Sequence, residues 1–157
     1  MKTLNWLATF SIAAMASFAP NALAGTITVT TMEPLRNSKG TLRCALWTQD
    51  KGFPGESQNA DKLSSAAISG NTAVCSFEGV AAGKYAVSVL HDENDNEKID
   101  VMPYGAPTEG YGTSNNADPL PMSPPSFNGA VFEYDGSSVK LTLAMRYPEF
   151  EGGPPRQ

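Results

Sequence analysis

The feature that most constrains the fold is an alternation of apolar and polar residues that recurs along the chain. In residues 40–47 it places Leu42, Cys44 and Leu46 on one face. A period of two is typical of half-buried β-strands. We predict strands in six segments, 25–32, 40–47, 72–80, 83–91, 129–134 and 137–145.

Helical periodicity is nearly absent and amounts to one or two turns near 59–68. Asp135-Gly136 lies between the last two predicted strands and predicts a hairpin, because both positions tolerate a positive φ. The sequence therefore predicts an all-β fold: a single β-sandwich of Ig-like or transthyretin (prealbumin)-like type with six to seven strands.

The two ends of the chain are expected to lie outside this domain. Residues 1–24 contain Lys2, an apolar stretch and the ending Ala22-Leu23-Ala24, in the order that is typical of a cleaved signal peptide. The apolar stretch is too short for a membrane span. We predict a sandwich domain at 25–148 and a disordered tail at 149–157, which is rich in Gly and Pro. The expected location is periplasmic or secreted, with no membrane span in the processed protein.

The net charge of −5 comes without a cluster of Lys or Arg, so nucleic acid is not an expected partner. Cys44 and Cys75 are the two cysteines, and both are in phase with apolar neighbours. In an oxidising compartment such a pair predicts a disulfide, which would stabilise the fold by about 3 to 4 kcal/mol. A metal pair or a catalytic thiol is the alternative, and either would need a histidine nearby.

Residues 91–100, HDENDNEKID, gather acidic and amide side chains directly behind a predicted strand. Counted from the first aspartate, the oxygen donors fall at alternate positions, as in the Ca²⁺-binding loop of an EF-hand. These donors are Asp92, Asn94, Asn96, the backbone carbonyl of Lys98, and Asp100. The spacing predicts a Ca²⁺ site.

The match to that loop is partial. Glu97 stands where a glycine makes the sharp turn, and Pro103 stands where a bidentate glutamate completes the site. Glu109 would supply this carboxylate if the chain folds back. Further oxygen donors follow at Ser114, Asn115 and Asn116. The alternative is a solvated turn, since Asp and Asn side chains bond readily to turn backbone.

His91 is the single histidine, so a zinc site built on several imidazoles is excluded. Paired with Asp92 or Glu109 it would serve as a general acid or base, with Ser114 as nucleophile of a small periplasmic hydrolase. No G-x-S-x-G motif surrounds Ser114. A hydrogen-bonded structural role is the alternative for a lone histidine at a strand end.

The segment 102–128 is too long for a simple turn and is rich in Pro, Gly, Asn and Ser. Its prolines and aromatics would bind a ligand or an extracytoplasmic protein if exposed, or cover the open end of the sandwich. They are Pro103, Tyr104, Pro107, Tyr111, Pro119, Pro121, Pro124 and Pro125.

Three stretches together resemble one known family: 77–100, 105–116 and 124–127. They follow the pattern G-x-YA-x-x-x-x-HD-x-N-x-N-x-x-x-D and then G-x-P-x-E-x-x-G-x-SN, which is similar to a secreted bacterial family catalogued as domain of unknown function 2141. The resemblance implies an extracytoplasmic β-sandwich without an established activity. It carries the family's polar positions onto His91, Asp92, Asn94, Asn96, Asp100, Glu109, Ser114 and Asn115. Glu97 replaces a frequent glycine, and Met102 replaces a frequent asparagine.

The leading hypothesis is an exported, non-catalytic β-sandwich with a polar loop site at 91–116 that binds Ca²⁺ or another ligand. A hydrolase centred on His91 is one alternative. A transthyretin-like small-molecule carrier is another.

Overall fold

The computed structural model describes residues 24–120 and 123–148 and shows an all-β fold, as predicted. The expected signal peptide up to residue 23, Pro121 and the tail at 149–157 lie outside the described residues. The described strands are β1 (Ala24–Thr31), β2 (Thr41–Trp47), β3 (Lys62–Ala67), β4 (Val74–Ala81), β5 (Gly83–Asp92), β6 (Gly110–Thr113), β7 (Pro119–Leu120), β8 (Ser123–Pro125), β9 (Phe132–Tyr134) and β10 (Val139–Leu143). The helices are α1 (Phe127–Ala130) and two 3-10 turns at Ser57–Asn59 and Ser114–Asn116.

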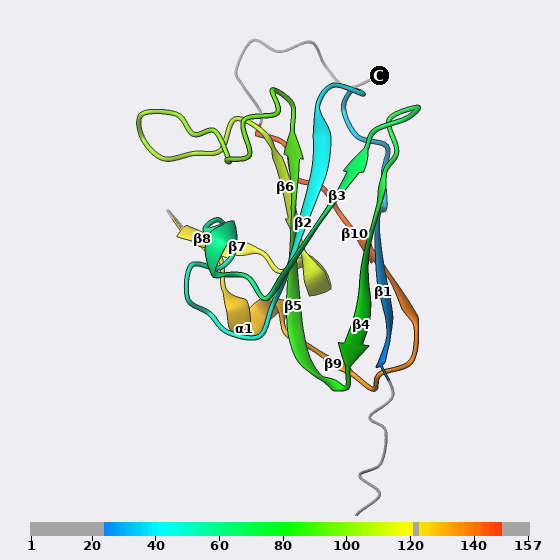
Figure 1. Ribbon diagram of the computed structural model, residues 1–157. Coiled ribbons are helices and arrows are strands. Elements are labelled where there is room, and N and C mark those ends of the chain that lie inside the picture. The colour runs from blue at the N-terminus through cyan, green and yellow to red at the C-terminus, as the bar shows by residue number, and fades with distance from the viewer. Residues whose placement is uncertain (1–23, 121–122, 149–157) are drawn as a thin grey trace, which may run out of the picture.

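Two sheets pack face to face in a sandwich (Figure 1). One sheet has the order β10-β1-β4, and the other has the order β3-β2-β5-β6, with β9 added beside β5. Strands β7 and β8 form a separate small hairpin. Pairing is antiparallel except between β1 and β10, which run parallel.

The main core lies between the two sheets and follows the predicted alternation. Ile27 and Val29 of β1 face Leu42 of β2 and Val87 and Val89 of β5, and all are buried. The predicted disulfide joins Cys44 to Cys75 within this core, with the two Cα atoms 6.4 Å apart. It connects one sheet to the other.

The outer face of the second sheet is also buried at one end. Ala45 and Trp47 point away from the main core, yet they are covered by the loop after β2 and by α1. Phe53 packs edge to face against both Trp47 and Phe127, with ring centroids 5.5 and 5.6 Å apart. The opposite end of this face has no such cover, and the groove described below lies there.

One strand was missed and one local prediction was wrong. The segment near 59–68, which has one or two turns of helical periodicity, contains β3, because residues 62–67 pair with β2. Asp135-Gly136 does not close a hairpin, since β9 pairs with β5 whereas β10 crosses to β1 in the other sheet. Gly136 has a φ of 90°, but Asp135 has no positive φ, so the expected turn conformation is present at the glycine alone. Short β3, β6, β7 and β8 raise the strand count above the expected six to seven.

Among the described residues, no helix has the length and apolar character required to cross a membrane.

Candidate functional site

The acidic loop leaves β5 at Asp92 and returns to the sheet in β6. As the calcium hypothesis required, Glu109 folds back onto it. Its Oε1 accepts the amide N–H of Glu93 at 2.9 Å, and its Oε2 accepts the amide N–H of Asp100 at 3.1 Å. The carboxylate is buried and bridges the two ends of the loop.

The carboxylate of Asp92 has no exposed surface and lies beneath the same loop. It accepts hydrogen bonds from Arg43 Nε at 2.5 Å, from the Glu97 amide at 2.9 Å and from the Asn96 amide at 3.1 Å. Burial by itself raises the pKa of Asp92, but the bonds from Arg43 and the two amides outweigh it and hold the pKa below its ordinary value. The carboxylate is therefore ionised and its acceptor sites are in use.

Arg43 extends from β2 into the centre of the acidic loop. Besides its bond to Asp92, its guanidinium lies 3.3 Å from a Glu97 oxygen and 3.8 Å from an Asp95 oxygen. The hydrogen bond to Asp92 raises the pKa of Arg43. A cation supplied by a neighbouring strand thus neutralises part of the charge that was expected to attract a metal.

The two asparagines of the predicted calcium site form local turns. Asn94 Oδ1 accepts the amide of Asn96, and Asn96 Oδ1 accepts the amide of Lys98. Each side-chain nitrogen then donates to Asp100, at 2.7 and 3.0 Å. The orientation of both amides follows from these turns, because the backbone N–H groups need the oxygens as acceptors.

The structure thus brings the predicted ligands together, with their side-chain oxygens bonded to protein donors. Within residues 24–120 and 123–148, no three His, Cys, Asp or Glu side chains form a group that could hold a metal ion. Glu97, at the position where an EF-hand has glycine, has a φ of 65°, in the left-handed region that glycine favours. Glu97, which replaces a glycine frequent in the family pattern, therefore has a strained backbone conformation.

His91 is fully buried and does not pair with either predicted carboxylate. Its Nε2 lies 2.9 Å from the Lys39 carbonyl, and its Nδ1 lies 2.8 Å from the Tyr147 hydroxyl. The carbonyl can only accept, so we assign the proton to Nε2, and the tyrosine donates to Nδ1. Burial raises the pKa of Tyr147 to about 12. The histidine holds the residues after β10 against β5.

Ser114 and its neighbours also support backbone. The Ser114 hydroxyl accepts the Val87 amide at 2.9 Å and donates to the Ala130 carbonyl at 2.6 Å. Asn115 donates to the Val131 carbonyl, and Asn116 accepts the Ala144 amide. No hydrogen bond between described residues links Ser114 to His91, so the structure does not assemble the predicted catalytic pair.

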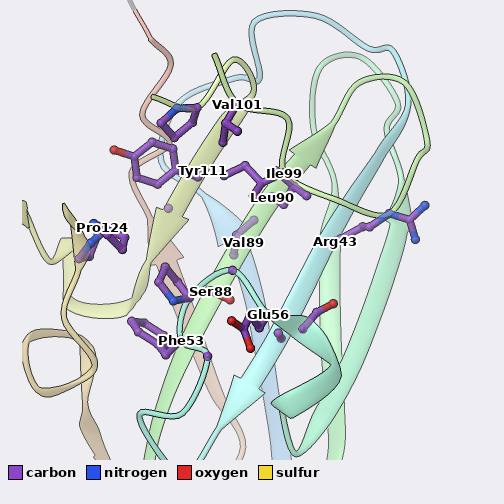
Figure 2. Close-up of a pocket in the computed structure, with 18 of the residues that line it drawn as sticks. Arg43, Phe53, Glu56, Ser88, Val89, Leu90, Ile99, Val101, Tyr111 and Pro124 are labelled. Atoms are coloured by element: carbon purple, nitrogen blue, oxygen red, sulfur yellow. The ribbon is translucent and has the colours of Figure 1, made fainter. Parts of the chain in front are cut away.

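A groove of about 980 Å³ lies on the open end of the outer sheet face, and the sequence reasoning did not identify it. Ser88, Leu90 and Tyr111 of β5 and β6 form much of its floor (Figure 2). Its walls come from the loop at 52–57, from the far half of the acidic loop at 97–107, and from the hairpin of β7 and β8.

More than half of the large exposed apolar side chains in the described part of the chain lie at this groove. Seven large apolar side chains are exposed among the described residues, and four of them line it. These four are Leu63, Val101, Tyr104 and Leu120, with exposures from 54% at Val101 to 71% at Tyr104. Exposed apolar surface that gathers in one place marks binding sites. The Pro-rich segment was the one sequence feature that pointed to this groove, because four of its prolines line it: Pro107, Pro119, Pro124 and Pro125.

The acidic loop and the groove are parts of one structure. Glu97, Ile99 and Val101 belong to the loop that Asp92 and Glu109 hold in place, and all three line the groove. The polar network therefore positions one groove wall before any ligand arrives.

The model of a family described as an uncharacterized protein conserved in bacteria (DUF2141) matches residues 29–142. No curated protein and no solved structure matches the chain.

Proposed function

We propose that this chain, which belongs to the uncharacterized bacterial family DUF2141, is an exported, non-catalytic binding domain that holds a ligand with an apolar body in the groove. The observation that carries the proposal is the gathering of four exposed apolar side chains around one concavity of about 980 Å³. Pockets for organic ligands have this composition and reach this size.

The loop network supports binding by preorganisation. The backbone from residue 92 to 109 is tied by buried carboxylates and by Asx turns, so the wall loses little conformational freedom when a ligand binds. The groups that a hydrolase would use are engaged elsewhere: His91 with Lys39 and Tyr147, and Ser114 with strand backbone. Export is consistent with the disulfide, since such bonds persist in oxidising compartments.

Binding of Nile red, a neutral apolar dye, tests the proposal by fluorescence titration. We expect saturable binding that Val101→Ser weakens by about fivefold, because burial of half a valine side chain contributes about 1 kcal/mol. Val74→Ser is the matched control, since Val74 is 53% exposed, Val101 is 54% exposed, and Val74 lies outside the groove.

Equal affinities for the two variants would show that the dye does not use the groove. Absence of saturable binding to the unmodified protein, at concentrations where the dye stays dissolved, would contradict the proposal itself. The melting temperatures of both variants should match the parent, because both side chains are exposed.

Calcium binding by residues 92–100 is a second candidate, and the observation in its favour is that Glu109 folds back over the loop. The ligands would be Asp92, Asn94, Asn96, the Lys98 carbonyl, Asp100 and Glu109. A bound ion would have to displace the donors that now occupy these oxygens. If the site exists, millimolar Ca²⁺ raises the melting temperature relative to EDTA, and Asp100→Asn removes the rise.

A transthyretin-like small-molecule carrier is a further proposal, and it too is a ligand-binding function. There the ligand would lie in a channel between two copies, whereas this groove is complete within one chain. The two are distinguished by the stoichiometry of dye binding and by the mass of the complex in solution.

A further inference from the structure

We infer that the groove selects small molecules with a cationic end: an apolar chain or ring system that carries an ammonium-type group. The inference rests on the proposed function and adds the charge of the ligand to it. Its basis is the balance of charge around the groove.

The groove has one basic side chain among the described residues that line it, Arg43, and this cation is already neutralised. It binds the fully buried carboxylate of Asp92 at 2.5 Å and lies near two further carboxylates. In Figure 2 the Arg43 side chain extends away from Leu90 on the groove floor. A carboxylate or phosphate on a ligand would therefore have to compete with protein carboxylates for this guanidinium.

Two other charged side chains line the groove, and both are acidic. Glu97 belongs to the acidic loop, and its side chain is 75% exposed. Glu56 belongs to the opposite wall and is exposed, with one carboxylate oxygen bonded to the amide of Asn59. Arg43 and the surrounding carboxylates together leave the rim of the groove with a net negative charge, which attracts cations and repels anions.

The remaining lining groups suit the same class of ligand. Phe53, Tyr104 and Tyr111 bring aromatic rings to the groove, and aromatic faces attract organic ammonium groups. Ser57, Ser65 and Ser123 add neutral hydroxyls. The net charge of −5 on the whole chain acts in the same direction over a longer range.

Three probes with one ten-carbon chain test the inference: decyltrimethylammonium, decanol and decanoate, each below the concentration at which it forms micelles. Displacement of Nile red reports their affinities at pH 7 and low salt. We expect the ammonium compound to bind at least about threefold more tightly than decanoate, the ratio that a partly exposed ion pair gives. The ratio should fall as salt is added.

Two substitutions that neutralise the carboxylates of the rim test the assignment. Glu56→Gln with Glu97→Gln should lower the preference for the ammonium compound over decanoate and leave decanol affinity unchanged. Both replacements keep the side-chain shape. Glu78→Gln, on the other sheet and outside the groove, removes one exposed carboxylate charge and should leave the preference unaltered.

The outcomes separate the two proposals. If none of the three probes displaces the dye, the groove is not a binding site and the proposed function fails. If all three bind with equal affinity, or decanoate binds best, the groove binds apolar molecules and the cation preference is refuted. An effect of Glu78→Gln about half as large as that of the pair, which its single charge would give, would assign the preference to net charge and overturn the role of the rim.

Discussion

Removal of the positive charge of Arg43 should destabilise the fold more than removal of any surface charge. Arg43→Met keeps much of the side-chain volume but leaves the Asp92 carboxylate, which has no exposed surface, with two backbone amides as its hydrogen-bond donors. Removing one partner of a buried ion pair costs about 3 to 5 kcal/mol. Because Arg43 is 27% exposed, water compensates in part, and we expect about 2 to 3 kcal/mol.

That loss corresponds to a fall in melting temperature of about 6 to 12 °C for a domain of this size. Thermal unfolding followed by circular dichroism measures it. Arg146→Met is the control, because Arg146 also binds an aspartate at 2.5 Å, but its partner Asp118 is 86% exposed. We expect that variant to lose less than about 1 kcal/mol.

The double variant Arg43→Met/Asp92→Asn should be more stable than the sum of the single losses predicts, because it no longer buries an unpaired charge. A loss in Arg43→Met no larger than in Arg146→Met would refute the reasoning. It would mean that the loop rearranges to hydrate Asp92, and that the groove wall is less rigid than its hydrogen bonds indicate.

Three further predictions concern the same elements. The folded protein lowers the pKa of Asp92, so the ionised carboxylate stabilises the fold above about pH 4. This stabilisation is lost as the pH falls through the lower pKa of Asp92 in the folded state. The difference in melting temperature between the parent and Asp92→Asn should therefore shrink on acidification. Glu97→Gly should raise the free energy of unfolding by about 0.5 kcal/mol, and Glu97→Ala should not. Both variants lose the carboxylate, but glycine alone adopts the positive φ of this position without strain. Equal melting temperatures of the two variants would refute this. Reduction of the bond between Cys44 and Cys75 should cost about 3 to 4 kcal/mol in denaturant unfolding, and a thiol assay on denatured, unreduced protein should detect no free cysteine.

Much of the sandwich could be predicted because its main strands carry their own burial pattern. Cys44, Cys75 and Phe77 each lie in phase with apolar neighbours, and all three are buried in the core as expected. The prediction failed where strand partners were decided at long range. Asp135-Gly136 has strong turn chemistry, but turn propensity does not determine which strands pair, and β10 found its partner more than a hundred residues earlier in β1.

In the candidate site, too, local features could be predicted and long-range contacts could not. Spacing in residues 92–100 predicted that polar side chains converge, and they do. The sequence contained no sign that Arg43, 49 positions before Asp92, would supply the cation at their centre. That contact depends on the pairing of β2 with β5, which sets Arg43 beside Leu90.

The sequence alone determined which segments form the main strands, that the two cysteines meet, and where polar side chains cluster. These properties follow from alternation and from local turn chemistry, which act over a few residues. The tertiary structure decided that the acidic loop is closed by Arg43 and that a groove exists. A groove is a property of several segments at once: its lining comes from residues spread between Arg43 and Pro125, brought together by strand pairing that no local pattern encodes.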